Sequence, residues 1–195
     1  MNTVIIYCHP VEGSFCSAMR DAAQRGLVAA GHDVEIIDLA KDGFDPIMGL
    51  DEWQVYMSRG GEVPTELERY ARLIRMAEIV VFVYPTWWSG VPAQLKGWFD
   101  RVLVPGVAFS FSDDGKVQPA LEHIHKMFIV TTYGSPKLYV RLVNDNGRRL
   151  ISRALRIATK KRARATHLGL YEMDKATDTH RREFLQKIEK TMARA

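Results

Sequence analysis

Two adjacent tryptophans, Trp87 and Trp88, are the residues of this chain whose type and spacing point most directly to a binding site. They stand in a turn between a wholly apolar run, residues 79–83, and a segment whose apolar residues have helical spacing. Two neighbouring indoles are unfavourable to expose to water unless a large aromatic group lies against them. We therefore expect a flat ligand to lie on this turn, whose residues are Pro85, Thr86, Trp87, Trp88 and Ser89.

A loop near the N-terminus offers a second candidate site. Ser14 has the position of an N-cap, and the backbone N–H groups of Phe15 and Cys16 follow it at the start of a helix. Such a terminus suits phosphate, and His9 would add a donor, although a plain N-cap and a solvated histidine are the alternatives. A helix start favours a lowered thiol pKa for Cys16. Without an evident partner residue, we expect Cys16 to be structural or phosphate-facing rather than a nucleophile.

A third candidate loop follows the apolar run at 127–132. Its residues Thr131, Thr132, Tyr133 and Gly134 leave the run through a glycine, which permits close approach of the backbone to a ligand. A glycine after a strand is weak evidence of a binding site by itself. The predicted fold, which places this loop beside the other two, strengthens the evidence.

Five short apolar or β-branched runs predict strands at 3–8, 33–39, 79–84, 127–132 and 166–171. Helical segments alternate with these runs, which predicts an α/β fold with a parallel sheet and right-handed crossovers. The first, third and fourth runs are continuously apolar and belong at the centre, so the predicted strand order is 2-1-3-4-5. In that order the three candidate loops leave the sheet at one edge, where ligands of such folds bind.

The remaining elements follow from helical spacing, caps and turn residues. Helices are predicted from Ser14, from Pro64 to about Ala77, from about Pro92, over 147–161 and over 179–193. Long loops are predicted over 41–61, with a short helical turn near 51–57, and over 133–146. An excursion over 105–119 contains the turn pair Asp114-Gly115.

The length of 195 residues, with 47% hydrophobic and 26% charged residues, predicts one soluble globular domain over 1–195. No apolar run approaches the roughly 18 residues of a membrane span, and residues 1–8 have the pattern of a strand rather than an export signal. Cys8 and Cys16 have the spacing of neither a zinc site nor a redox pair. We therefore expect a reduced, cytoplasmic chain that is not membrane-spanning.

The net charge of +4 is unevenly distributed. Residues 147–170 include eight basic residues and no acidic one, and without them the charge would be 4 − 8 = −4. A solvated helix face is one interpretation, and a surface for an anionic ligand, a lipid or an acidic protein partner is the other. Few aromatic residues are interleaved, which disfavours nucleic acid. The basic residues are Arg148, Arg149, Arg153, Arg156, Lys160, Lys161, Arg162 and Arg164.

These motifs resemble those of the NAD(P)H:quinone oxidoreductases of the flavodoxin-like superfamily, which include ancillary oxidoreductase subunits of bacterial potassium-efflux systems. The similarity covers most of residues 3–135, and the C-terminal third is not matched as well. It rests on a long, specific motif, Pro85-x-x-Trp88-x-Gly90-Val91-Pro92-Ala93-x-Leu95-Lys96-Gly97-Trp98-Phe99-Asp100-Arg101-Val102. His9 followed by Ser14-Phe15, and Thr131-Thr132-x-Gly134, support it.

The resemblance implies a noncovalently bound flavin, FMN or FAD, with NAD(P)H as co-substrate and no metal. By the same resemblance, the phosphate end would be held by His9, Ser14, Phe15 and Cys16. The isoalloxazine would be lined by Pro85, Thr86, Trp87, Trp88 and Ser89, and its pyrimidine side would contact Thr131, Thr132, Tyr133 and Gly134. Tyr139 has the place of a tyrosine that lies beside the flavin in mammalian members.

The chain departs from the family pattern at three positions. Cys16 stands where asparagine is usual, and Tyr133 replaces the first glycine of a Thr-Thr-Gly-Gly sequence. Asp145 replaces a histidine that follows the tyrosine by six residues in mammalian members. This last change puts the family's charge-stabilising Tyr/His pair in doubt, whereas flavin binding depends largely on backbone donors.

The implied activity is two-electron hydride transfer from NAD(P)H through the flavin to a quinone or similar acceptor. Tyr133, Gly134 and Tyr139 would stabilise the negative charge of the reduced flavin. A regulatory flavoprotein subunit of a transport system and an azo- or nitro-reductase are the alternatives. The apolar stripe Leu95, Trp98, Phe99 and Val102, beside Phe109 and Phe111, further predicts a homodimer in which each pocket is completed by the partner.

Overall fold

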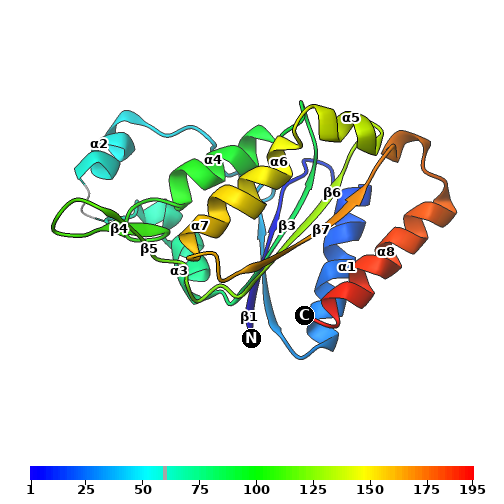
Figure 1. Ribbon diagram of the computed structural model, residues 1–195, viewed down its shortest axis with the longest axis horizontal. Helices are drawn as coiled ribbons and strands as arrows, with labels where there is room; N and C mark the ends of the chain where they lie inside the picture. The colour runs from blue at the N-terminus through cyan, green and yellow to red at the C-terminus, as the bar shows by residue number, and fades with distance from the viewer. Residues whose placement is uncertain (59–60) are drawn as a thin grey trace.

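Five parallel strands form the central sheet of the computed structural model, which describes residues 1–58 and 61–195 (Figure 1). Their order is β2-β1-β3-β6-β7. The strands are β1 (Asn2–Tyr7), β2 (Asp33–Asp38), β3 (Ile79–Pro85), β6 (Lys126–Thr132) and β7 (Arg164–Leu170). Because β6 and β7 are the fourth and fifth strands of this sheet along the chain, the predicted order 2-1-3-4-5 is confirmed.

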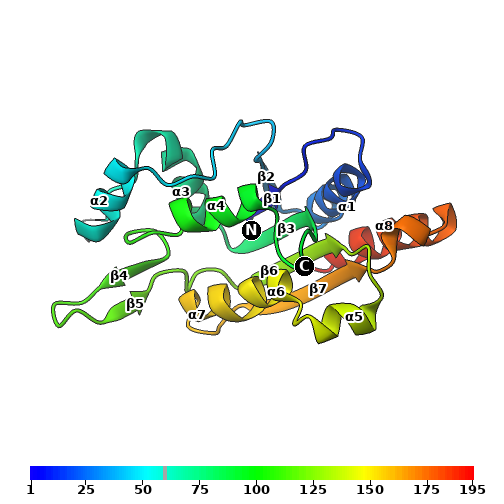
Figure 2. The same ribbon diagram turned by 90° about the horizontal axis from the view of Figure 1, so that it is seen from above.

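Helices cover both faces of the sheet (Figures 1 and 2). One face is covered by α1 (Phe15–Ala29) and α8 (Asp178–Met192), and the other by α3 (Glu68–Met76), α4 (Ala93–Val102) and the helical segment at 146–158. Successive residues of a strand point to opposite faces. Ile5 and Tyr7 accordingly pack in the cluster with α1 and α8, while Val4 and Ile6 pack in the cluster with α3 and α4. The fold is the predicted three-layer α/β sandwich.

Two further elements extend from the edge of this sandwich (Figure 2). The predicted helical turn near 51–57 is the helix α2 (Leu50–Ser58), and residues 59–60 of the expected loop lie outside the described residues. The excursion over 105–119 contains an antiparallel hairpin of β4 (Phe109–Phe111) and β5 (Val117–Pro119). Short 3₁₀ helices, η1 (Thr65–Leu67) and η3 (Met173–Lys175), precede α3 and α8.

The loop expected over 133–146 was predicted wrongly in part, because it contains the helix α5 (Lys137–Leu142). Pro136 precedes this helix, and Val140 is its only buried residue, so the helix lacks the apolar stripe on which the prediction relied. The helix expected over 147–161 is also not a uniform α-helix. It consists of α6 (Asn146–Arg149), a π-helical segment η2 (Leu150–Leu155) and α7 (Arg156–Ala158).

The apolar stripe of α4 belongs to the core of the chain itself. Leu95, Trp98 and Val102 are fully buried, and Phe99 is nearly so, in the cluster that also contains Phe82. The stripe is therefore not an exposed interface, and this ground for a homodimer is wrong. No helix in the described ranges, 1–58 and 61–195, is both long and apolar enough to cross a membrane.

Candidate functional site

The carboxyl ends of β1, β3 and β6 bring the three candidate loops to one edge of the sheet, as the strand order predicts. The hydroxyls of Thr86 and Thr131 lie 3.1 Å apart, and the N–H of Thr86 donates to the carbonyl of Thr132 at 2.9 Å. These bonds join the second and third loops. The rings of His9 and Trp87 have their centroids 6.2 Å apart, which joins the first loop to the second.

A cavity of about 270 Å³ lies between the second and third loops and the helix α5. Six of the predicted site residues line it: Thr86, Trp88, Ser89, Tyr133, Gly134 and Tyr139. Four lining residues were not predicted as site residues: Ser135, Val140, Val143 and Asp145. Val140 and the exposed Tyr139 belong to α5, so this part of the wall was missed together with the helix.

The tryptophan turn has a backbone conformation that favours glycine. Trp88 and Ser89 both have positive φ, 46° and 58°, and Trp87 and Gly90 exchange two backbone hydrogen bonds of 3.2 and 3.0 Å across them. This is the geometry of a type I′ turn, which usually holds Asn-Gly. Two larger residues there store strain, and the turn presents Trp88 fully exposed at its tip.

Backbone donors at the cavity are free to bind a ligand. Within the described part of the chain, the N–H groups of Trp88, Ser89, Gly134 and Ser135 have no hydrogen-bond partner. Gly134 also leaves space beside its Cα, since an added Cβ would meet only a carboxylate oxygen of Asp174 within 4 Å. The second and third loops thus offer a set of donors around the cavity.

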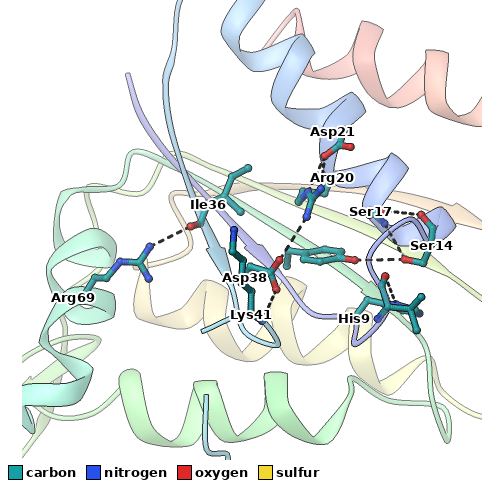
Figure 3. Close-up of polar contacts among 11 residues, drawn as sticks. His9, Ser14, Ser17, Arg20, Asp21, Ile36, Asp38, Lys41 and Arg69 are labelled. Atoms are coloured by element: carbon teal, nitrogen blue, oxygen red, sulfur yellow. Dashed lines mark hydrogen bonds and ion pairs between the residues drawn. The ribbon is translucent and has the colours of Figure 1, made fainter. Parts of the chain in front are cut away.

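The first loop has the predicted N-cap. The Ser14 hydroxyl oxygen accepts from the N–H of Ser17 at 3.2 Å, and Figure 3 shows the two side chains together at the start of α1. Among the described residues, the N–H groups of Phe15 and Cys16 have no acceptor. The Nδ1 atom of His9 lies 3.1 Å from the backbone nitrogen of Val11 and 3.2 Å from its carbonyl oxygen, so this side of the ring is bound within its own loop.

None of His9, Ser14, Phe15 and Cys16 lines the 270 Å³ cavity, so the first loop lies outside the space between the second and third loops. His9 lines a second cavity of about 250 Å³ instead. There Arg20 lies over the ring of Tyr7, 4.8 Å from its centroid, and pairs with Asp38 at 3.6 Å (Figure 3). The other residues around this second cavity are Pro10, Glu12, Ala40 and Lys41.

The side chains of four predicted residues point into the protein. Cys16 is 4% exposed, and burial raises the pKa of its thiol to about 12, so the lowered pKa expected from the helix start is wrong. The ring of Phe15 packs 6.5 Å from that of Phe184. Pro85 is buried within β3, and the hydroxyl of Thr131 is bonded to its neighbours.

Tyr133 and Asp145, which line the 270 Å³ cavity, belong to a polar cluster. The O–H of Tyr133 donates to Asp145 at 2.9 Å, and His167 Nε2 lies 3.1 Å from the hydroxyl oxygen of Tyr133. One hydroxyl proton serves only one of these partners, so His167 Nε2 is the donor of the second bond. Tyr133 also stacks on Tyr171 with centroids 4.6 Å apart, and Arg148 pairs with Asp145.

Burial sets the protonation of this cluster. It raises the pKa of Tyr133 and lowers the pKa of His167 to about 4, so both are neutral at pH 7. Sequence reasoning missed His167, although a histidine within a strand is a signal for a polar partner beside that strand. Its place opposite Ile129 in the β6–β7 register brings it under the third loop. In residues 1–58 and 61–195, no group of three or more His, Cys, Asp or Glu side chains is arranged to hold a metal ion.

The fold and the position of the cavity define a flavodoxin-like protein, and a model of the flavodoxin-like fold family matches residues 1–191. The structure of Smu.1420 from Streptococcus mutans UA159 superposes with a TM-score of 0.87 at 27% identity, covering 100% of both chains. The NAD(P)H:quinone oxidoreductase from Methanothermobacter marburgensis superposes at 0.82 and 25% identity, covering 98% of this chain and 94% of the other. An azoreductase from Bacillus anthracis solved with FMN, at 18% identity and a TM-score of 0.76, shares the fold.

A curated relative, NAD(P)H dehydrogenase (quinone) 1 of Rattus norvegicus, is 30% identical over 154 residues, which cover 70% of this chain and 55% of that enzyme. The chain spans about half the length of the first curated relatives that it matches, 55% and 54%. With the match over 1–191, these similarities show that the chain belongs to the flavodoxin-like NAD(P)H:quinone oxidoreductase family.

Proposed function

We propose that this chain is a flavin-dependent NAD(P)H oxidoreductase, one domain over 1–195, that reduces quinones or similar acceptors by two-electron hydride transfer. The observation that carries the proposal is the cavity at the ends of β3 and β6, with an exposed indole at its rim and unpaired N–H groups in two of its loops. The quinone reductases among the relatives support the same reaction class.

The residues present fit a flavin. The aromatic side chains of Trp88 and Tyr139 line the cavity, and the N–H groups of Ser89, Gly134 and Ser135 suit the carbonyl oxygens and nitrogens of a heteroaromatic ring. The free N–H groups at the start of α1, with Ser14 and His9, suit a phosphate beyond the ring. A flavin bound there would supply hydride transfer between NAD(P)H and the acceptor.

The chain itself orients the reactants and stabilises charge. Trp88 offers a flat apolar surface at the mouth, against which a nicotinamide or quinone ring packs. The Tyr133 hydroxyl donates to Asp145 and is not free for a ligand, so we assign stabilisation of negative charge to the Gly134 N–H and the Tyr139 hydroxyl. Tyr133, which replaces the family's glycine, thus contributes through the loop to which it belongs rather than through its hydroxyl.

We also propose that the protein is a homodimer of the reducing cytoplasm. Both cysteines are free and buried, in agreement with that compartment. A dimer would cover the exposed Trp88 and the exposed apolar residues before and along α2, which are Ile47, Leu50, Trp53 and Met57. Completion of each cavity by the partner remains part of this proposal.

An absorbance spectrum of the purified protein with added FMN or FAD tests the main proposal. We expect bound flavin bands that bleach under anaerobic NADPH or NADH and recover when menadione is added. The variant Tyr139→Phe should slow the reductive and oxidative steps without loss of flavin. A protein that takes up neither flavin would rule out the proposed activity.

A further inference from the structure

Asp145 is the one charged side chain among the described residues that line the cavity. Among the described residues that line the cavity, the others are aromatic, aliphatic, hydroxyl-bearing or glycine. The Asp145 side chain is 7% exposed, so water screens its charge poorly. A ring placed in this cavity therefore lies beside a buried carboxylate.

The surrounding contacts hold Asp145 in place. It accepts from the Tyr133 hydroxyl and pairs with Arg148, and its backbone has a positive φ of 47° that few residues adopt without support. Burial raises the pKa of Tyr84, Tyr133 and Tyr171, and the negative charge of Asp145 adds to each rise. The tyrosines around the carboxylate thus stay neutral and add no further negative charge.

Arg148 is the only cation paired with Asp145 among the described residues, and it balances the charge incompletely on the cavity side. Its side chain is 34% exposed, whereas that of Asp145 is 7% exposed and lines the cavity. Water screens the guanidinium more than the carboxylate. His167, which reaches the cluster through Tyr133, is neutral at pH 7 and adds no positive charge.

We propose that Asp145 sets the charge preference of this cavity: it disfavours negative charge on the ring that occupies it, selects neutral over anionic acceptors, and lowers the reduction potential of a bound cofactor. The last two consequences rest on the proposed function, and the first does not. The physical cause is Coulomb repulsion in a poorly screened site, where reduction adds negative charge to the cofactor ring.

Two variants of opposite sign test the idea. Asp145→Asn removes the buried charge and keeps the side-chain shape, whereas Arg148→Met leaves the carboxylate without its partner. With flavin bound, a spectroelectrochemical titration should give a higher midpoint potential for Asp145→Asn and a lower one for Arg148→Met. A tenfold change in the ratio of oxidised to reduced affinity corresponds to about 30 mV for a two-electron couple, and we expect shifts of this order.

A binding measurement without flavin tests the charge preference alone. Quenching of tryptophan fluorescence gives the affinities of a neutral naphthoquinone and of its sulfonated analogue. In Asp145→Asn the preference for the neutral compound should fall about tenfold, and in Arg148→Met it should increase. Asp113→Asn, which removes an exposed carboxylate from the hairpin loop, is the matched control and should change neither quantity.

The outcomes separate the two proposals. If the protein binds no flavin but the neutral-over-sulfonate preference falls in Asp145→Asn, the proposed activity fails and the role of Asp145 stands. If flavin and menadione react as proposed but both variants shift the potential in one direction, or neither shifts it, the role of Asp145 is overturned. If circular dichroism shows that Asp145→Asn does not fold, the variant at the more exposed Arg148 provides the test. A lower midpoint potential in Arg148→Met would then support the role of Asp145, and a higher or unchanged one would overturn it.

Discussion

Cys16 stands at the start of α1, where free N–H groups and the helix dipole favour a thiolate, yet its pKa is raised to about 12 because it is buried. Cys8 is also buried, and its pKa is raised to about 11. In the folded protein both thiols should therefore react with an aromatic disulfide at pH 8 far more slowly than a free thiol does. Denaturation should expose both. Rapid labelling of two thiols in the native state would contradict this.

His167 makes the folded protein sensitive to mild acid. Its pKa is lowered to about 4 by burial, against about 6.5 in an unfolded chain, although the charge of Asp145 acts the other way and Lys137, Arg148 and Lys187 add to the lowering. As pH falls, the imidazole takes up a proton in the unfolded chain before it does so in the folded protein. The stabilisation that comes from keeping His167 neutral is therefore complete above about pH 6.5, and it is lost progressively between about pH 6.5 and pH 4.

The full loss, reached near pH 4, amounts to about 3 kcal/mol, and about 2 kcal/mol of it falls between pH 7 and pH 5. Urea unfolding at pH 7 and pH 5 measures it, with His167→Gln as the comparison because glutamine keeps a donor but does not titrate in this range. We expect a smaller difference between the two pH values in the variant. An equal difference in both proteins would mean that carboxylates alone account for the acid sensitivity.

The tryptophan pair could be singled out from its residue types, but the conformation of its turn could not be predicted. Trp88 and Ser89 lack the Asn-Gly signature of a type I′ turn, so sequence gives no sign of their positive φ values. The polar cluster beside the cavity could not be predicted for a different reason. Tyr133, Asp145 and His167 meet only when β7 lies beside β6, and the contact spans 34 residues of sequence.

At the scale of elements, the turn at Trp87–Gly90 stores strain that glycine would relieve. Ser89 has a φ of 58°, and Ser89→Gly should stabilise the protein by about 0.5–1 kcal/mol, since relief of strain exceeds the entropy that glycine adds to the unfolded chain. Ser89→Ala keeps the strain and serves as the control. Urea unfolding measures both, and a destabilised glycine variant would show that the turn is not strained.

Close packing of α4 on the loop before α2 depends on one glycine. A Cβ at Gly97 would lie 2.3 Å from both the Cα and the carbonyl oxygen of Pro46, so the backbone would have to move. Gly97→Ala should therefore cost about 2–3 kcal/mol in unfolding free energy. At Gly49 an added Cβ meets nothing within 4 Å, and Gly49→Ala should stay within about 0.5 kcal/mol of the parent. Equal effects would refute the packing argument.

The strands were predictable because buried parallel strands have continuous apolar runs, which β1, β3 and β6 show clearly. The helix α5 was not, since it buries only Val140 and so carries almost no apolar periodicity. The π-helical segment η2 was missed because its apolar and basic residues fit an α-helix equally well. The elements without a periodic apolar pattern are thus the ones that sequence left undefined.

At the scale of the whole molecule, the basic stretch is less available to a partner than its composition indicates. Arg148 pairs with Asp145, and both Lys160 and Arg162 pair with Glu122. Arg156 donates to two backbone carbonyls, those of Ala163 and Lys161. Four basic residues of the stretch remain, and we propose that an acidic partner would bind through them. They are Arg149, Arg153, Lys161 and Arg164.

The expectation of a dimer now rests on the exposed apolar residues around α2. The helix α2 buries none of its residues within the chain, although Leu50, Trp53 and Met57 are large and apolar. Exposed apolar surface of this kind marks an interaction site. We expect light scattering at micromolar concentration to give twice the chain mass of 22.2 kDa.

The double variant Leu50→Asp/Trp53→Asp should give a monomer without unfolding, because neither side chain belongs to the core. Val28→Asp, at a single exposed apolar residue on α1, is the matched control and should stay dimeric. Loss of the dimer should also raise the KM for the acceptor, since each cavity would lose the covering surface of its partner. A monomeric parent protein would instead mean that Trp88 and α2 face another partner, and that one chain alone forms the complete site.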